Sequence, residues 1–182
     1  INLDFYKGIV DEKDSKLFNE FLKKLGVSKE VKLNQIEIPY MTASRFVKKI
    51  PYSTRYIKFT ENRPDGFDQL FGSIKTNPKK SVVLWNYLLS ICKKDLKNLE
   101  ILHCDYFYYR DRYENFVSIF KTMLTTEKWL LNSKNELVSP KEIFTVELKN
   151  HYDVNSTEYP ILINFLEIKD KIVNNNFSKE EQ

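Results

Sequence analysis

Glycine is scarce in this sequence, which has only four glycines among 182 residues. A phosphate-binding loop needs closely spaced glycines, because its backbone must approach the phosphate directly. Neither Gly-x-x-x-x-Gly-Lys nor Gly-x-Gly-x-x-Gly occurs, and Gly8, Gly26, Gly66 and Gly72 are too widely separated to form a similar loop. The sequence therefore predicts no nucleotide site of either type, and we expect no bound cofactor.

Cysteine and histidine are rarer still, with two residues of each type. Cys92 and Cys104 are too few for a disulfide scaffold, and they lack the paired spacing of a zinc site. His103 directly precedes Cys104, but neighbouring side chains of a strand point to opposite faces, so we expect no catalytic thiol pair there. His151 lies in a different element. The sequence predicts buried free thiols, no metal site and no enzyme activity.

One acidic pattern leaves a different class of protein open. Asp153 and the later Glu167-Ile168-Lys169 loosely fit the upstream acid and Glu-x-Lys pattern of metal-dependent nucleases. The pattern is permissive, because the solvated end of a helix commonly has the same residue types. A fragment of a metal-dependent nuclease is therefore kept as an alternative.

Long apolar runs are absent as well. No stretch approaches the roughly 20 apolar residues that span a bilayer, and the sequence does not open with a basic segment, an apolar stretch and a cleavage site. We therefore expect a cytoplasmic protein without a membrane partner. The chain begins at Ile1 and not at methionine, so we interpret it as a piece of a longer multidomain polypeptide.

Large apolar side chains are plentiful: 42% of the residues are hydrophobic and 14% are aromatic, which is enough to fill a core. Apolar residues at helical spacing predict helices over 67–74, 78–94 and 115–125. The second of these has the strongest start signal, because Asn77 suits the N-cap and Pro78 suits the first turn.

Three other segments have the composition of strands. Residues 31–38 alternate between apolar and polar side chains and end at a proline. Residues 55–60 and 104–109 are rich in aromatic and β-branched side chains, which favour extended backbone. These segments predict strands that share one small sheet.

The predicted fold class is α+β, with amphipathic helices packed on a small, mainly antiparallel sheet. We expect the helices at 78–94 and 115–125 to cover strands from the regions of Tyr56, Phe107 and Trp129.

A hairpin with a capped helix directly after it is the most sharply specified local structure. Apolar residues at 129–131 and 136–138 flank the turn sequence Asn-Ser-Lys-Asn, whose residue types tolerate unusual backbone angles. Ser139 suits an N-cap, Pro140 suits the first helical position, and Glu142 can reach back to Ser139 to close a capping box.

The chain is predicted to have three parts. Residues 1–26 form a leading part with a helix over 14–25, which we interpret as the possible end of a preceding unit. Residues 27–173 form the α+β module. Residues 174–182 form a polar tail that is expected to fray.

A stretch that combines basic and aromatic residues is the candidate binding site. Its cations are Arg45, Lys48, Lys49, Arg55, Lys58 and Arg63. The rings among them are Phe46, Tyr52, Tyr56 and Phe59, and the only acid is Glu61. Cations neutralise phosphates while rings stack on bases, so this mixture is typical of nucleic-acid binding. The alternative is a strand with one core face and a charged edge that prevents aggregation.

A second aromatic cluster runs from Tyr106 to Tyr113. Aromatic packing in the core is its ordinary explanation, and a binding platform is the alternative.

Residues 116–168 resemble the middle regions of very large, sacsin-like ATP-binding proteins, whose GHKL-type (Hsp-ninety-like) ATPase domain lies elsewhere in the polypeptide. The resemblance rests on Tyr106-Phe107-Tyr108-Tyr109, Ser118, Lys128-Trp129-Leu130, Ser139-Pro140-Lys141-Glu142-Ile143, Tyr152 and Leu162-Ile163-Asn164-Phe165-Leu166-Glu167-Ile168. Ser133-Lys134-Asn135 replaces the glycine that is often present in the turn.

The resemblance implies a module of a large bacterial protein, some of whose relatives accompany chaperone-like activity, restriction or phage defence. It transfers no catalytic residue, because the ATPase signature is absent from this chain. The leading hypothesis is a non-catalytic structural or protein-interaction module, whose partners are other domains of the same polypeptide. A nucleic-acid-binding module is the first alternative and the nuclease fragment is the second.

Overall fold

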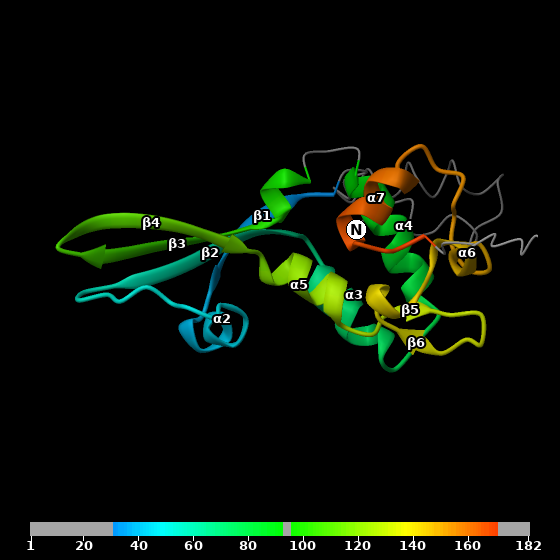
Figure 1. The fold of residues 1–182 in the computed structure, drawn as a ribbon, viewed down its shortest axis with the longest axis horizontal. Helices are drawn as coiled ribbons and strands as arrows, with labels where there is room; N and C mark the ends of the chain where they lie inside the picture. The colour runs from blue at the N-terminus through cyan, green and yellow to red at the C-terminus, as the bar shows by residue number, and fades with distance from the viewer. Residues whose placement is uncertain (1–30, 93–95, 171–182) are drawn as a thin grey trace, which may run out of the picture.

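The computed structural model describes residues 31–92 and 96–170 (Figure 1). These residues form one four-stranded antiparallel sheet, one two-stranded sheet and several helices, which confirms the predicted α+β fold class. The predicted leading helix at 14–25 and the predicted tail at 174–182 lie outside the described residues. None of the described helices is long and apolar enough to cross a membrane.

The larger sheet has the strand order β1-β2-β3-β4, and all neighbouring strands are antiparallel. Its strands are β1 (Leu33–Ile38), β2 (Ile57–Pro64), β3 (Ile101–Tyr108) and β4 (Arg110–Val117). The predicted strands at 31–38, 55–60 and 104–109 are therefore confirmed as β1, β2 and β3. Strands that follow one another in sequence are neighbours in space, so the sheet is a simple meander.

β4 and the helix after it, α5 (Ile119–Thr126), differ from the sequence prediction. We expected a helix from residue 115, but 115–117 pair with β3. Phe116 fits the helical spacing of the later residues, yet it packs against the core from β4. The helix begins after Ser118 because the Ser118 hydroxyl accepts a hydrogen bond from the Lys121 amide at 3.0 Å, which satisfies a donor of the first turn.

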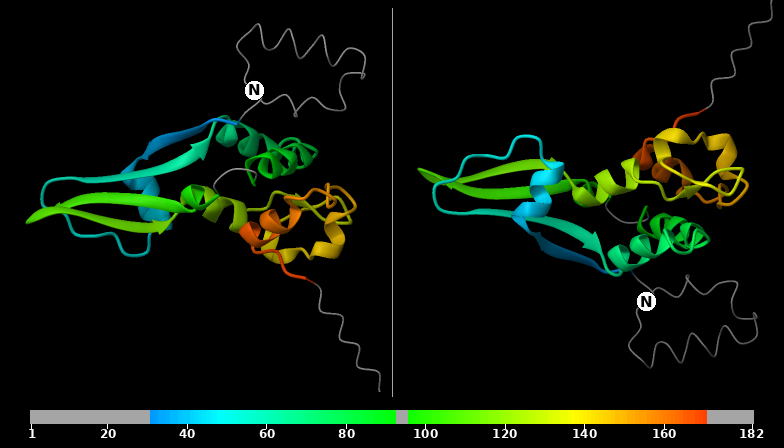
Figure 2. Two further views of the ribbon diagram at one scale, coloured as in Figure 1. Left: turned by 90° about the horizontal axis from the view of Figure 1, so that it is seen from above. Right: turned by 90° about the horizontal axis from the view of Figure 1, so that it is seen from below.

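The two faces of the larger sheet have different surroundings. On one face, called the core face, Phe59 and Cys104 pack with Ala43 of α2 (Tyr40–Phe46) and with Ile119 of α5. Alternate residues of the same strands lie on the opposite face, called the open face. No described helix packs across the open face in Figures 1 and 2, so its side chains are exposed along β4 and exposed or only partly buried along the central strands β2 and β3.

A second and larger core lies at the other end of the molecule. It is built by α3 (Phe67–Ile74), α4 (Lys80–Cys92), α6 (Thr145–Leu148), α7 (Tyr159–Leu166) and the small hairpin of β5 (Leu130–Leu131) and β6 (Leu137–Val138). Trp85, Trp129 and Phe120 are fully buried in it. Figure 1 shows the larger sheet extending away from this helical end.

α4 confirms the helix predicted at 78–94 over Lys80–Cys92, and 93–94 lie outside the described residues. The expectation that this helix covers the larger sheet is wrong. The helix packs against α3 and α7 at the helical end (Figure 2). The physical reason is that α4 is apolar around most of its circumference, with Leu84, Trp85 and Ile91 all fully buried. Such a helix needs neighbours on several sides, and a single sheet face provides only one. The Trp129 hairpin likewise forms a separate sheet.

The hairpin and its cap follow the prediction closely. Asn135 in the turn has a positive φ of 64°, a conformation that asparagine tolerates better than most residues. The Glu142 carboxylate accepts hydrogen bonds from the Ser139 amide at 2.8 Å and from the Ser139 hydroxyl at 2.9 Å. Pro140 opens a single 3₁₀ turn, Pro140–Glu142.

Candidate nucleic-acid interface

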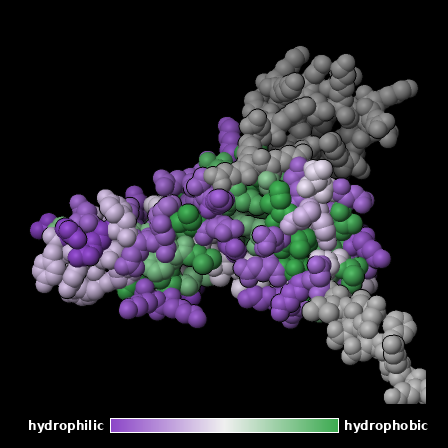
Figure 3. All heavy atoms as spheres, turned by 45° about the horizontal axis from the view of Figure 1, so that its top comes forward, coloured by the Kyte–Doolittle hydropathy of each residue, from purple (hydrophilic) through white to green (hydrophobic). Residues whose placement is uncertain are grey.

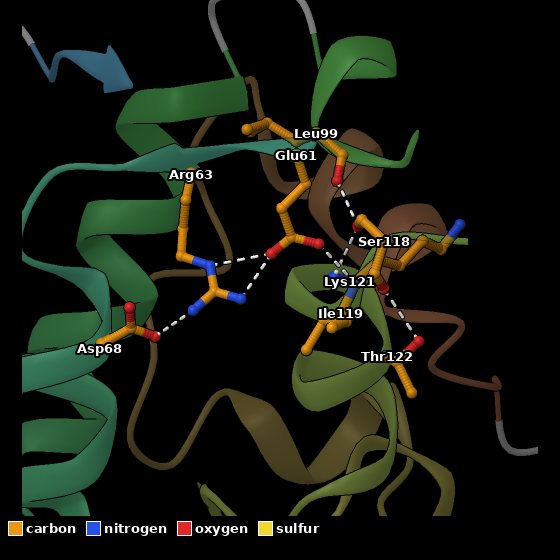
Figure 4. Close-up of polar contacts among 8 residues, drawn as sticks. All are labelled: Glu61, Arg63, Asp68, Leu99, Ser118, Ile119, Lys121 and Thr122. Atoms are coloured by element: carbon orange, nitrogen blue, oxygen red, sulfur yellow. Dashed lines mark hydrogen bonds and ion pairs between the residues drawn. The ribbon is translucent and has the colours of Figure 1, made fainter. Parts of the chain in front are cut away.

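Arg63 lies in a buried ionic network (Figure 4). Its Nε and Nη2 atoms donate to Glu61 Oε1 at 2.9 and 2.5 Å, and its Nη1 donates to Asp68 Oδ1 at 2.5 Å. The Arg63 side chain is 11% exposed and the Glu61 side chain is 0% exposed. Burial acts to lower the pKa of Arg63, but the hydrogen bonds and charges of Asp68 and Glu61 outweigh it, so the net pKa is raised.

The second oxygen of Glu61 begins the next helix. Glu61 Oε2 accepts a hydrogen bond from the Ile119 amide at 2.7 Å, where the helix dipole favours a negative charge. Ser118, beside it, donates from its hydroxyl to the Leu99 carbonyl and accepts from the Lys121 amide. Figure 4 shows Glu61 between the Arg63 guanidinium and the start of α5.

This network joins β2, α3 and α5, which are the elements at the junction of the two cores. Every polar group of Arg63 and Glu61 described above already has a partner, and among the described residues no buried side-chain nitrogen or oxygen lacks one. Arg63 would lose two ion pairs if it turned to a phosphate. We therefore leave Arg63 out of the candidate interface.

Lys58 lies on the open face and is partly committed to another group. Its Nζ lies 3.2 Å from Glu37 Oε2, and both side chains are more than half exposed. An exposed ion pair of this kind is weak, so Lys58 can exchange partners at little cost. It lies on the face of the sheet opposite to α2, however, and therefore away from Arg45.

Arg45, Lys48 and Lys49 are exposed on the core-face side of the sheet. Arg45 is in the last turn of α2, and the two lysines follow directly. Val47 is buried in the core of the sheet, and Ile50 packs against that core. Lys48 and Lys49 lie between these two residues in the chain, and their side chains extend into solvent.

Arg55 reaches the sheet at its far end. Its guanidinium carbon lies 4.2 Å from the centre of the Phe107 ring, which is a cation–π contact. The ring of Tyr56 lies 6.4 Å from the same Phe107 ring. Arg55 and Tyr56 are exposed, and Phe107 is partly buried. The adjacent residues Arg55 and Tyr56 therefore form an exposed patch of a cation and a ring beside Phe107.

The Tyr106 to Tyr113 cluster divides between core and surface. Tyr106 is buried, at 8% exposed, as the core interpretation expects. Tyr109 and Tyr113 are 81% and 76% exposed, and Tyr52 from the preceding loop is 73% exposed. Tyr108 lies between Tyr109 and Tyr52, with ring centres 4.6 Å and 5.9 Å away. The binding-platform alternative therefore has geometric support for part of the cluster.

Two arginines that the sequence analysis passed over lie beside these rings. Arg110 is exposed directly after the β3–β4 turn, and the Arg112 guanidinium carbon lies 5.8 Å from the centre of the Tyr108 ring. The predicted helix at 115–125 concealed them, because it left 110–114 as a connection without a face. A strand alternation in Arg-Asp-Arg-Tyr-Glu would have been the signal.

Two carboxylates in the same region are engaged by tyrosines. Tyr56 donates its hydroxyl hydrogen to Asp111 Oδ1 at 2.7 Å, and Tyr106 donates to Glu114 Oε1 at 2.8 Å. These hydrogen bonds raise the pKa of both tyrosines. Asp111 and Glu114 are acidic neighbours of the cations, so they offset part of the positive charge of the region.

We call the resulting surface the distal surface. It consists of Lys48, Lys49, Tyr52, Arg55, Tyr56, Tyr108, Tyr109, Arg110 and Arg112. The β3–β4 turn and the start of β2 lie at the end of the larger sheet farthest from the helical core, and the segment with Lys48 and Lys49 leads there from α2 (Figures 1 and 2). Tyr108 lies on the core-face side of this end, whereas Arg55 and Tyr56 pack with Phe107 on the open-face side. In Figure 3 this end carries mainly pale and purple spheres, which mark residues of intermediate and high hydrophilicity, while green hydrophobic residues gather nearer the middle.

The alternatives that involve catalysis receive no geometric support. His103 Nδ1 lies 2.9 Å from Asn115 Oδ1 on the open face, whereas Cys104 is fully buried on the core face, so the predicted divergence of the two side chains is confirmed. Burial raises the pKa of the Cys104 thiol to about 11.

The residues of the nuclease pattern are engaged separately. Asp153 Oδ1 accepts from the Asn155 amide, and Glu167 Oε1 lies 3.8 Å from Lys121 Nζ. Within 31–92 and 96–170, no three histidine, cysteine or acidic side chains are placed to hold a metal ion.

A cavity of about 570 Å³ opens beside α6 and α7. Its lining is mainly apolar, with Val146, Val154 and Ile163 among its side chains, and the only charged residues are Lys149 and Asp170. The Asp170 carboxylate accepts a hydrogen bond from the Thr145 hydroxyl. We assign no chemistry to this mainly apolar cavity.

The sequence matches no protein-family model, no curated protein and no solved structure. The resemblance to sacsin-like proteins therefore stays a prediction that rests on the residues quoted for it.

Proposed function

We propose that this chain is a non-catalytic module that binds nucleic acid through its distal surface. The observation that carries the proposal is the gathering of exposed tyrosine rings and exposed cations at one end of the sheet, from two segments about 55 residues apart in the chain. Lys48, Lys49 and Arg110 are exposed, and no hydrogen bond or ion pair to a carboxylate is described for their side chains, so they can neutralise phosphates without breaking an internal contact.

Part of the sequence-based site carries over into this proposal. Arg55, Lys48 and Lys49 remain in the interface, Arg45 lies next to it on α2, and Lys58 lies on the open face with Glu37. Arg63 is replaced by Arg110 and Arg112. The surface is therefore assembled by the fold and not by one continuous stretch of sequence.

The proposal is tested with the Lys48→Ala/Lys49→Ala/Arg110→Ala variant and labelled oligonucleotides, by fluorescence anisotropy at several salt concentrations. We expect the unaltered protein to bind more tightly as salt falls, with a dissociation constant on the order of 10⁻⁴ to 10⁻⁶ M at physiological salt. Removing three phosphate contacts should reduce the slope of log affinity against log salt by about 2.

A matched control removes the same charge elsewhere. Lys79, Lys134 and Lys141 are exposed and lie outside the distal surface, so their triple alanine variant should retain the affinity. Equal losses in the two triple variants would indicate non-specific attraction by net charge. No binding to any nucleic acid at 50 mM salt would contradict the proposed function.

A second candidate is the non-catalytic interaction module of a large ATP-binding protein, as the resemblance implies. It is supported by the mixed signs on the open face, where Lys58 pairs with Glu37, and by the frequent presence of tyrosine and arginine at the centres of protein interfaces. Its test is the association of the isolated chain with the neighbouring domains of its parent polypeptide. Variants of the distal surface should weaken that association. Neither the unaltered protein nor these variants should bind nucleic acid.

A further inference from the structure

Resting on the proposed function, we infer that the ligand is a single strand whose bases stack on Tyr52 and Tyr109. Phosphates of the same strand would lie along Lys48, Lys49 and Arg110. This inference names the form of nucleic acid and the residues that select it, and each step follows from the arrangement of the distal surface.

The rings form a short tilted ladder. Tyr109 and Tyr108 are T-shaped, with centres 4.6 Å apart and an angle of 66° between their planes. Tyr52 meets Tyr108 at 5.9 Å and 81°. Among residues 31–92 and 96–170, the one ring contact of each outer ring is with Tyr108. Tyr109 and Tyr52 are 81% and 73% exposed, so each has a face open to solvent. A base can therefore stack on either outer ring.

The ladder is held in place by backbone contacts. Tyr109 has a positive φ of 59°, which turns the chain sharply between β3 and β4. Thr54 donates its amide hydrogen to the Phe107 carbonyl at 2.9 Å, and Phe107 donates to the Tyr56 carbonyl at 3.1 Å. The loop that carries Tyr52 is thus paired with β3, so the rings are ordered before a ligand arrives and little conformational entropy is lost on binding.

Cations are close to the ladder along the chain, and one of them contacts a ring directly. Lys48 and Lys49 precede Tyr52 on the core-face side, and Arg110 follows Tyr109. Arg112 lies over the central ring. Of the nearby acids on the core face, Glu114 is hydrogen-bonded to a tyrosine hydroxyl. A flexible backbone can follow this arrangement while its bases turn inward to the rings.

A duplex fits the same surface poorly for two reasons. Its bases are already stacked on one another, and unstacking costs a few kcal/mol per step. A two-stranded ribbon can enter the major groove, which is about 12 Å wide. Here the pairing of residues 54–56 with Phe107 adds a third strand, so the backbone alone is about 10 Å wide before side chains are counted.

The test compares single strands with duplexes of equal phosphate number, by fluorescence anisotropy at 50 mM salt. Oligonucleotides of two, four and eight thymidines or uridines are used as probes. We expect the affinity to rise with oligonucleotide length up to about four nucleotides, the lower end of the site sizes of single-strand-binding domains. We expect single strands to bind at least about tenfold more tightly than duplexes.

Two variants and one control identify the stacking residues. Tyr52→Ser and Tyr109→Asn should each weaken single-strand binding by about 5- to 150-fold. Asparagine is chosen at 109 because it tolerates the positive φ. Tyr113→Ser removes an equally exposed ring outside the ladder and should change affinity less than about twofold. All three residues are exposed, and circular dichroism is used to check that the variants retain the fold.

The outcomes separate this inference from the proposed function. The inference would be overturned if duplex and single strand bound with equal affinity. If the Lys48→Ala/Lys49→Ala/Arg110→Ala variant still bound more weakly than the unaltered protein in that case, the proposed nucleic-acid binding would stand. Equal effects of Tyr113→Ser and Tyr109→Asn would also overturn the assigned ladder. Binding to no nucleic acid would remove both proposals, and a protein partner captured through the distal surface would then favour the second candidate.

Discussion

Replacing Glu61 with alanine should destabilise the fold strongly. The carboxylate is fully buried and accepts three hydrogen bonds, two from Arg63 and one from the Ile119 amide. Alanine removes all three acceptor contacts and leaves a largely buried cation and a helix amide without this partner. Asp68 continues to pair with Arg63, which limits the loss.

The magnitude follows from these contacts. Removing one member of a buried ion pair costs about 3–5 kcal/mol, and an unsatisfied buried amide costs about 1–3 kcal/mol. The two costs are not additive, because one carboxylate makes both contacts. We expect the free energy of unfolding to fall by about 4 kcal/mol, which is a large part of the about 5–15 kcal/mol that stabilises a domain.

Chemical denaturation followed by tyrosine and tryptophan fluorescence measures this loss. Lys58→Ala is the matched control, because Lys58 lies on the same strand and also belongs to an ion pair, with Glu37 at 3.2 Å. Both side chains of this ion pair are exposed, so losing the pair should cost less than about 1 kcal/mol. A thermal scan should show Glu61→Ala melting about 10 °C below the unaltered protein.

Glu61→Gln and a double variant separate charge from hydrogen bonding. Glutamine keeps one acceptor oxygen and should cost about half as much as alanine. Glu61→Ala and Arg63→Ala together should cost less than the sum of the single variants, because the second removes the cation that the first leaves unpaired. If Glu61→Ala costs no more than Lys58→Ala, the network does not stabilise the junction and the reasoning fails.

Burial raises the pKa of Cys92 to about 12 and that of Cys104 to about 11. At pH 8 both thiols should therefore react with an aromatic disulfide at least about a hundredfold more slowly in the folded than in the unfolded protein. The Ser139 amide lowers the pKa of Glu142 from 4.5. A lowered folded pKa stabilises the fold above the unfolded value, so the stability advantage over Glu142→Gln should be complete above pH 4.5 and decline as the pH falls below it, as urea denaturation across pH 3 to 7 would measure. Tyr152→Phe removes a hydroxyl that serves two buried partners and should lower the free energy of unfolding by about 1–3 kcal/mol, measured in the same way.

Local signals in the sequence predicted local structure well. The hairpin and the reach of Glu142 to Ser139 were readable because turn chemistry and capping depend on residues three or four positions apart. Strands β1, β2 and β3 were found for a similar reason, since alternation and β-branched residues act within a few positions, whereas β4 was missed. Fold class followed from these elements.

The errors arose where tertiary contacts decide. Phe116 fits a helical stripe and a strand face equally well, and only its pairing partner on β3 selects the strand. Glu61 looked like the single acid opposing a basic stretch, but burial beside Arg63 makes it the centre of a structural network. Arg110 and Arg112 have no local pattern that marks them as neighbours of Tyr52, because the fold brings together segments far apart in the chain.

The Glu61 carboxylate also has a mechanical consequence. It couples the strand that leads to the distal surface with the first turn of α5, which in turn packs against the helical core. A pull on the far end of the sheet would be transmitted through this junction into the helices without bending the backbone between them. The sheet and the helical end are therefore joined by a side-chain contact as well as by the backbone, and separating the two ends would require this buried contact to break.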